Sequence, residues 1–298
     1  MIVPSILKPL YKIHHSDKIN RRVWLPGKML WRPCYQLHKY PFEDNECYTV
    51  ILMNGSLRYN FSEQYFLKLK EEHPNIKQVM ILYDSFINKA ASRSISMIPI
   101  FDCIFSFDKN DCEKYGFERI YSTFSTPSYV YKDRKISTNA FFVGYGAGRL
   151  KLLLDSFEVI GNNIENCFFS VCGVQEKDKK NIPGVVYNRT MPYSDELQMA
   201  YNTKCIVEII KEGQVGISLR TCEAVSFNKK LITNNKQITN MPFYYERYMR
   251  VFTKPEEIDL DFLLTDIDVK YERDDYFSPI RIIERLEQIN KSETKESS

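Results

Sequence analysis

The sequence lacks any apolar run that approaches the length of a membrane-spanning helix, and its first residues do not form the apolar core of a secretory signal. We therefore expect a cytoplasmic protein, with at most a peripheral contact on the inner face of the cytoplasmic membrane. The formal net charge of +3 is too small to indicate a nucleic-acid-binding protein.

Cysteine is present, but not in the patterns that bind metals or form redox pairs. The eight cysteines include no CxxC pair, and no Cys/His cluster has the spacing of zinc ligands. We therefore expect free thiols in a reducing compartment, no metal site and no resident cofactor.

Positive charge is concentrated at the start of the chain. Residues 1–40 contain Asp17 as their single acidic residue. Their basic residues are Lys8, Lys12, Lys18, Arg21, Arg22, Lys28, Arg32 and Lys39. Because aromatic and aliphatic side chains lie among these charges, the basic N-terminal segment 1–46 can lie on an anionic membrane surface. Alternatively, it is a solvated extension that packs on the first domain.

Short apolar segments alternate with helical patterns along the rest of the chain, which indicates βαβ units and parallel sheets. The expected strands are Tyr48–Met53, Val79–Tyr83, Ile100–Phe107, Ile120–Ser122, Ala140–Val143, Phe168–Val171, Val185–Tyr187, Lys204–Ile209, Leu231–Thr233 and Arg250–Phe252. A polar, strand-poor stretch at 124–138 is typical of a linker. The sequence therefore predicts an α/β protein with two Rossmann-like domains, at 47–135 and 136–290, and a disordered tail at 291–298.

The most informative stretch runs from Lys204 to Asn235 and reads as strand, glycine-broken loop, helix and strand. Its first strand contains Glu208, although a carboxylate inside an apolar strand is costly unless it has a specific role. Gly213 and Gly216 break the chain after this strand. Because ligands bind outside the carboxyl ends of strands in open α/β sheets, this loop is a candidate ligand site.

The helix after this loop begins with Ser218, Arg220 and Glu223 in its first turns. A helix N-terminus and an arginine can hold phosphate, and a carboxylate can accept hydrogen bonds from sugar hydroxyls. Lys211 and Gln214 of the preceding loop, with Gly216, complete the candidate donor-binding residues of this stretch. Alternatively, the glycines form an ordinary turn, and Arg220 and Glu223 pair on a solvated face of the helix.

A second glycine-rich loop follows the strand expected at Ala140–Val143 and precedes a helix. It contributes Gly144, Gly146, Gly148 and Arg149. A dinucleotide-binding enzyme also needs an acidic residue at the end of the next strand, but that strand ends at Cys172 and Gly173. The loop therefore fits a phosphate or diphosphate better than NAD or S-adenosylmethionine, although a plain βα turn is the alternative. Both loops would face one crevice if the strand order reverses between them.

Three segments carry a resemblance to a known family. They are IPIFDCIFSFDKNDCEKYGF in the first half, FFVGYGAGRL at the domain boundary and KCIVEIIKEGQVGISLRTCEAVSFNKKLITNN in the second half. Together they resemble glycosyltransferases of the GT-B fold, and more closely small bacterial lipopolysaccharide or exopolysaccharide biosynthesis proteins. The resemblance covers most of residues 20–285. It implies two Rossmann-like domains facing a cleft, with a nucleotide-sugar donor in the C-terminal domain, the acceptor in the N-terminal domain and no bound metal.

The resemblance also implies roles for individual residues. Glu223 resembles the carboxylate that contacts the donor ribose. The residues placed near the diphosphate are Gly144, Gly146, Arg149, Ser218 and Arg220. The common family pattern has another glutamate eight residues before Glu223, where this chain has Val215, and the nearest acids are Glu208 and Glu212. The residue that contacts the sugar, and the choice between retention and inversion, are therefore not predicted.

Sugar transfer requires stabilisation of the departing diphosphate and, in an inverting enzyme, a general base. Arg220, Arg149 and Lys211 are the candidates for charge stabilisation. The base should come from the ends of first-domain strands, where Asp84 and Asp108 stand. Alternatively, Asp108 is the N-cap of a short helix and Asp84 caps a turn.

The sequence therefore predicts a metal-independent glycosyltransferase of hexosyltransferase type. Its expected partners are a nucleotide-sugar donor and a growing bacterial surface glycan, which would be lipopolysaccharide, capsule or exopolysaccharide, with a lipid-linked acceptor among the options. Two alternatives stay open. One is another nucleotide-dependent Rossmann enzyme, an oxidoreductase or a methyltransferase. The other is a catalytically silent GT-B-like protein that binds a nucleotide.

Overall fold

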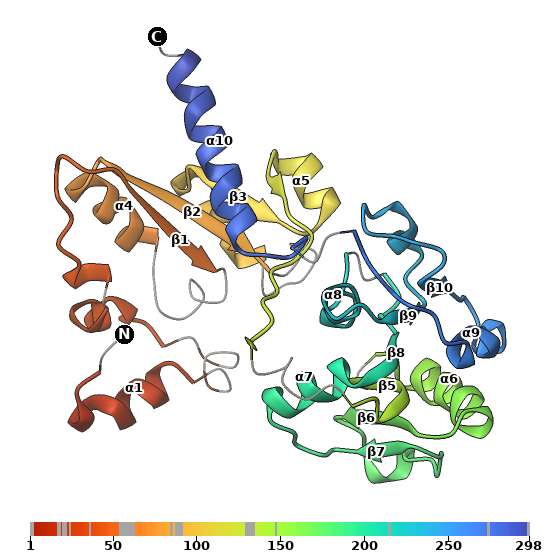
Figure 1. The fold of residues 1–298 in the computed structure, drawn as a ribbon. Helices are drawn as coiled ribbons and strands as arrows, with labels where there is room; N and C mark the ends of the chain where they lie inside the picture. Colours follow the sequence, from red (N-terminus) through yellow and green to blue (C-terminus); the bar gives the residue numbers. More distant parts are fainter. Residues whose placement is uncertain are drawn as a thin grey trace. The chain divides into compact units, whose positions relative to one another are not determined.

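The computed structural model describes residues 3–16, 19, 23, 25–35, 37–53, 63–83, 86, 92–128, 135–146, 148–213, 216–272 and 275–296. The chain divides into two units, Met1–Ile120 and Tyr121–Ser298 (Figure 1). The boundary between the units falls slightly before the linker that the sequence places at 124–138. No helix in the described ranges is long and apolar enough to cross a bilayer.

The first unit contains a parallel four-stranded sheet with the strand order β1-β2-β3-β4. Its strands are β1 (Tyr48–Met53), β2 (Ile76–Leu82), β3 (Cys103–Ser106) and β4 (Glu118–Arg119). Its helical segments are η1 (Ser5–Leu7), α1 (Lys8–His14), η2 (Lys28–Cys34), η3 (Leu37–Lys39), α4 (Glu63–Glu72), η4 (Ser92–Ile100) and α5 (Lys109–Tyr115). The prediction of a fourth strand at Ile120–Ser122 was wrong, because the two-residue strand β4 ends before it.

The core of the first unit forms where β2 meets α4. Nearly every residue of β2 is buried, which fits its run of aliphatic side chains at the centre of a parallel sheet. Tyr65, Phe66 and Leu69 provide the buried side of α4. Gln78 is the polar exception in β2, and its side-chain amide donates to the backbone carbonyl of Phe66 at 2.9 Å.

The second unit contains a parallel six-stranded sheet with the order β10-β9-β8-β5-β6-β7. Its strands are β5 (Thr138–Tyr145), β6 (Cys167–Cys172), β7 (Val185–Tyr187), β8 (Thr203–Glu208), β9 (Lys230–Thr233) and β10 (Met249–Val251). Its helical segments are α6 (Leu150–Asn163), η6 (Glu176–Asp178), α7 (Tyr193–Tyr201), α8 (Leu219–Ser226), η7 (Lys236–Asn240), η8 (Pro255–Glu257), α9 (Leu260–Leu264) and α10 (Ile280–Glu296). The expected α/β fold with two Rossmann-like parallel sheets is confirmed.

Helices cover both faces of the six-stranded sheet (Figure 1). Successive strand residues point to opposite faces, so Phe142 packs with α6 and α9 while Phe141 packs with α7 and α8. On the α6 face, the rings of Phe157 and Phe169 stack with their centroids 4.1 Å apart. These two cores fix the carboxyl ends of the strands, which is where the candidate site lies.

Two helix boundaries differ from the sequence predictions. The N-cap of α7 is Pro192, whereas the sequence favours Ser194, which lies inside the helix. The last helix continues to Glu296, through most of the segment for which the sequence predicts a disordered tail. The helix N-cap expected at Ser62 lies outside the described residues.

Candidate functional site

The strand order of the second unit reverses between β5 and β8. From β5 the chain builds outward through β6 and β7, and then returns to place β8, β9 and β10 on the other side. Such a reversal is the point at which open α/β sheets bind their ligands, in the crevice outside the carboxyl ends of the strands. The two glycine-broken loops of the sequence follow β5 and β8, so both open onto this crevice.

Close packing explains the glycines of the first loop. A Cβ at Gly144 would lie 2.9 Å from Cζ of Phe142 and 3.1 Å from Nη2 of Arg149. Gly148 has a φ of 76°, which a residue with a side chain adopts only with strain. The stem of Lys211 lies over Gly148, with its Cδ 3.5 Å from the position that a Cβ would take. The second loop therefore rests on the first.

Arg149 joins the two loops through its guanidinium group. Its Nε donates to the carbonyl of Tyr145 at 3.0 Å, and its Nη1 donates to the carbonyl of Ile209, the first residue after β8. The guanidinium carbon also lies 5.7 Å from the centre of the Phe142 ring. Burial lowers the pKa of Arg149, and the nearby charge of Glu208 opposes this shift. A fixed cation therefore stands at the switch point.

No side chain of the described residues caps the N-terminus of α6. Arg149 occupies the N-cap position without a capping hydrogen bond, and the first turn contains no acidic residue. The first N–H groups of a helix have no partner within the helix, and together with the helix dipole they favour an anion. Arg149, Lys211 and this helix end therefore concentrate positive potential beside Gly148.

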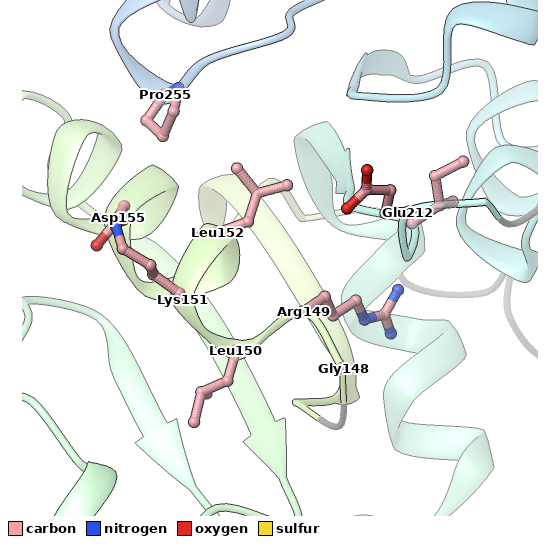
Figure 2. Close-up of a pocket in the computed structure, with 9 residues that line it drawn as sticks. Gly148, Arg149, Leu150, Lys151, Leu152, Asp155, Glu212 and Pro255 are labelled. Atoms are coloured by element: carbon pink, nitrogen blue, oxygen red, sulfur yellow. Dashed lines mark hydrogen bonds and ion pairs between the residues drawn. The ribbon is translucent and has the colours of Figure 1, made fainter.

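A pocket of about 570 Å³ opens beside this helix end (Figure 2). Its lining residues are Gly148, Arg149, Leu150, Lys151, Leu152, Asp155, Ile210, Glu212 and Pro255. Figure 2 shows Arg149 and Glu212 on one side of the pocket, and Lys151 and Asp155 on the other. The pocket offers cations for phosphate groups and two carboxylates that can accept hydrogen bonds from hydroxyls.

Glu208 differs from its expected role as a donor-binding residue. Its Oε1 accepts from the backbone N–H of Ser218 (3.1 Å), the Ser218 hydroxyl (2.6 Å) and the Thr221 hydroxyl (2.7 Å). Its Oε2 accepts from the Thr233 hydroxyl at 2.6 Å. Because Glu208 is fully buried and each oxygen has a donor, its carboxylate holds the start of α8 against β9 and is not open to a ligand. Protein packing thus explains the buried carboxylate.

Two further predicted residues of the second loop also have structural partners. Ser218 is the N-cap of α8, and its hydroxyl oxygen accepts from the N–H of Arg220 at 3.1 Å while it donates to Glu208. Gly216 is buried with a φ of 90°, and its carbonyl accepts from the side chain of Asn235 at 2.8 Å. Gln214 lies outside the described residues.

Arg220 and Glu223 contact each other, as the alternative interpretation of the sequence expects. The contact lies in the protein interior, however, and not on a solvated face of the helix. Nη2 of Arg220 donates to Oε1 of Glu223 at 2.7 Å and also to Oε1 of Glu196 on α7. Nη1 of Arg220 and Oε2 of Glu223 are buried, and neither has a hydrogen-bond partner among the residues that the structure describes. Arg220 therefore does not line the pocket beside α6, although sequence reasoning places it near the diphosphate.

Burial raises the pKa of Glu223 to about 8, with Arg220 opposing the shift and the charge of Glu196 adding to it. With 0% of its surface exposed, Glu223 can contact a ribose only after its neighbours move. Sequence reasoning missed Glu196, which completes this cluster. In the sequence, Glu196 stands out only as one of the two acidic residues in the first turn of the helix that begins at Tyr193.

Asp108, a candidate general base, is the N-cap of α5. Its Oδ1 accepts from the N–H groups of Asn110 (2.8 Å) and Asp111 (3.2 Å), and its side chain is fully buried. The alternative interpretation of Asp108 as a cap is therefore the better one. Asp84, the other candidate base, lies outside the described residues. No group of His, Cys, Asp or Glu in the described ranges could hold a metal ion.

The chain matches no known sequence family and no curated protein. Its fold is similar to those of solved glycosyltransferases with the GT-B architecture. One is an alpha-glucosyltransferase in complex with UDP-glucose and DNA containing an abasic site, at 11% identity and a TM-score of 0.46 over 68% of this chain and 65% of that chain. A variant of S. aureus TarM in complex with fondaparinux, alpha-GlcNAc-glycerol and UDP gives 12% identity and a TM-score of 0.45 over 72% and 48% of the two chains.

Anabaena HepE in complex with UDP-glucose gives 9% identity and a TM-score of 0.42 over 72% of this chain and 67% of that chain. The chain thus spans about half to two thirds of the length of the first two of these structures. At such identities the likeness concerns the fold alone, in which two α/β units are each built on a parallel sheet.

Proposed function

We propose that the protein is a glycosyltransferase that binds a nucleoside-diphosphate sugar at the switch point of its second unit. One observation carries this proposal: the glycine-broken loops after β5 and β8 meet there, joined by Arg149 and covered by Lys211. The cations and the uncapped end of α6 suit a diphosphate, and the pocket beside them has the volume of a small-molecule site.

In this proposal the protein supplies charge stabilisation. A hydroxyl oxygen of the acceptor attacks the anomeric carbon of the sugar, and the bond from that carbon to the diphosphate oxygen breaks. Negative charge then develops on the departing nucleoside diphosphate, where Arg149, Lys211 and the N–H groups of α6 stabilise it without a metal. The hydroxyl proton passes to a general base on the acceptor side. Asp108 is fully buried as the N-cap of α5, so Asp84 stays the candidate that the sequence offers for this role.

The acceptor in this proposal is a growing bacterial surface glycan, as the resemblance of the sequence to lipopolysaccharide and exopolysaccharide biosynthesis proteins implies. The pocket contains groups that would orient a sugar hydroxyl, since Glu212 is an exposed carboxylate on its rim. A hexose is the expected sugar.

A second candidate is a nucleotide-binding protein without turnover. The observation that favours it is the fate of the two glutamates near the second loop. Glu208 is saturated by protein donors and Glu223 is paired with Arg220, so neither offers an open carboxylate to a sugar. The chain also has Val215 where the family pattern has its other glutamate.

Calorimetric titration with UDP, GDP, CMP, TDP, NAD and S-adenosylmethionine tests the proposal. One nucleoside diphosphate should bind, and Lys211→Ala should weaken it about tenfold because one phosphate contact is lost. Lys177→Ala is the matched control, since Lys177 is an exposed lysine on η6 that belongs to neither of the two glycine-broken loops. Binding of NAD or S-adenosylmethionine alone would replace the proposal with another Rossmann enzyme.

Turnover separates the two candidates. Incubation with the sugar form of the nucleotide that binds should release free nucleoside diphosphate, slowly with water and faster with an acceptor glycan. Tight binding without release under either condition would favour the silent binding protein.

A further inference from the structure

The helix α1 packs on η2 of unit 1 through one of its sides. Tyr11 packs edge-on against Trp31 of η2, with ring centroids 5.1 Å apart. Nε1 of Trp31 donates to Nδ1 of His14 at 2.7 Å, which leaves Nε2 of His14 to donate to the carbonyl of Pro26 at 2.7 Å. Because Trp31 is only 6% exposed, this inner side of α1 has a well-packed partner.

The opposite side of the same segment is apolar and exposed. Ile6, Leu10 and Ile13 are 88%, 57% and 55% exposed, and their spacing of four and three residues places them along one side of a helix. We call these three residues the outer face. A helix that is anchored by its inner side presents this outer face in a fixed orientation, so the exposure does not come from an unpacked segment.

The charge around the outer face has one sign. Lys8 and Lys12 are exposed on the same helix, and the described residues between 3 and 42 contain no aspartate or glutamate. In the sequence, Asp17 is the single acid of residues 1–42. Exposed aliphatic side chains on one face of a helix, with lysines on its other faces, are the pattern of helices that lie in the interface of an anionic membrane.

We propose that the outer face of η1 and α1 docks on an anionic lipid bilayer. Ile6, Leu10 and Ile13 enter the boundary between head groups and acyl chains, and Lys8 and Lys12, on other faces of the same helix, add electrostatic attraction to the anionic surface. Charge complementarity favours a lipid surface as the binding partner, because an anionic bilayer supplies a dense negative charge. A bilayer also accepts a row of single apolar side chains, whereas a protein partner would need a groove of matching shape. The proposal does not depend on the glycosyltransferase activity.

Flotation of the full chain with vesicles tests this proposal. The vesicles contain phosphatidylcholine with an equal amount of phosphatidylglycerol, or phosphatidylcholine alone. The wild type should float with the anionic vesicles and release at high salt. The double change Leu10→Ser and Ile13→Ser should weaken binding about tenfold or more, because the inserted apolar area is lost. Lys8→Glu with Lys12→Glu should weaken it by a similar factor of about ten at low salt.

Leu264→Ser is the matched control, because Leu264 is an aliphatic residue of unit 2 with 54% exposure. It should bind vesicles like the wild type, and all variants should keep the wild-type melting temperature, since each changed side chain is exposed. A wild type that stays unbound at low salt, or serine variants that float equally well, would overturn the proposal. Self-association in sedimentation velocity that the serine variants abolish, without vesicle binding, would assign the outer face to a second copy instead.

Discussion

Two glutamates of the second unit are buried to the same extent but have opposite hydrogen-bonding environments. Glu208, at the end of β8, and Glu223, within α8, are each 0% exposed. Glu208 accepts four hydrogen bonds, from one backbone N–H and three hydroxyls. Glu223 accepts from Arg220 through one oxygen, and its other oxygen has no hydrogen-bond partner within the described part of the chain.

The difference shows that burial of a carboxylate does not identify a ligand site. The donors around Glu208 compensate for its desolvation, so its role is to fix the start of α8. Glu223 has fewer donors, and burial raises its pKa to about 8. Changes at the two positions should therefore have different consequences for stability.

The largest effect is expected for Glu208→Ala. This change leaves the Ser218 N–H and three hydroxyls in the interior without their acceptor, and it opens a cavity. We expect a loss of about 3–5 kcal/mol in the free energy of unfolding of unit 2. Urea unfolding followed by circular dichroism measures this loss. The control is Glu212→Ala, whose exposed side chain should matter little; equal stability of the two variants would refute the structural role of Glu208.

Arg220→Met should have an intermediate effect of about 2 kcal/mol on the same unfolding free energy. The change removes the shared donor of Glu196 and Glu223, but Glu223 can remain protonated and Glu196 is partly exposed, with 17% of its side chain accessible. Combining Arg220→Met with Glu223→Gln should cost less than the sum of the single changes, because the two residues are in contact. Strict additivity would show that the pair contributes no coupling energy.

The sheets could be predicted from the sequence because their strands are short apolar runs with clear breaks between them. Tyr48–Met53 and Val185–Tyr187 have the predicted limits. The strand expected at Ile120–Ser122 was misplaced because β4 has only two residues, Glu118 and Arg119, and its pairing with β3 depends on tertiary structure and not on an apolar pattern. Strand order, which creates the switch point, likewise depends on pairing between distant segments.

The candidate site could be predicted only in part, for the same reason. The two glycine-broken loops were expected to face one crevice if the strand order reverses between them, and the order does reverse between β5 and β8, with Lys211 over Gly148. The partners of Glu208 were not predictable, because Thr221 and Thr233 are 13 and 25 residues away along the chain. Glu196 is similarly 24 residues from Arg220. Local sequence reasoning therefore overestimated the number of open carboxylates.

The pH dependence of stability should separate Glu223 from Glu208. The pKa of Glu223 is raised from its ordinary value of 4.5 to about 8, so the folded state binds a proton more tightly than the unfolded state. Its stabilising contribution is complete below the ordinary value and is lost as the pH rises toward about 8. We expect a loss of about 1 kcal/mol per pH unit within this window. Urea unfolding of the wild type and of Glu223→Gln at several pH values measures this slope, which the wild type should show and the variant should lack. Equal slopes in the two proteins would mean that Glu223 is already ionised in the folded state.

The smallest effect is expected for Glu223→Gln in mildly acidic solution. There the folded protein already contains the protonated acid, so a neutral amide of the same shape should change the unfolding free energy by less than about 1 kcal/mol. The same substitution at Glu208 should cost more, because each oxygen of Glu208 faces a donor and an NH2 group would oppose one of them. Calorimetric melting of both glutamine variants at one acidic pH makes the comparison directly. Equal melting temperatures would mean that the carboxylate of Glu223 is as important to stability as that of Glu208, and that Arg220 keeps Glu223 ionised in the folded protein.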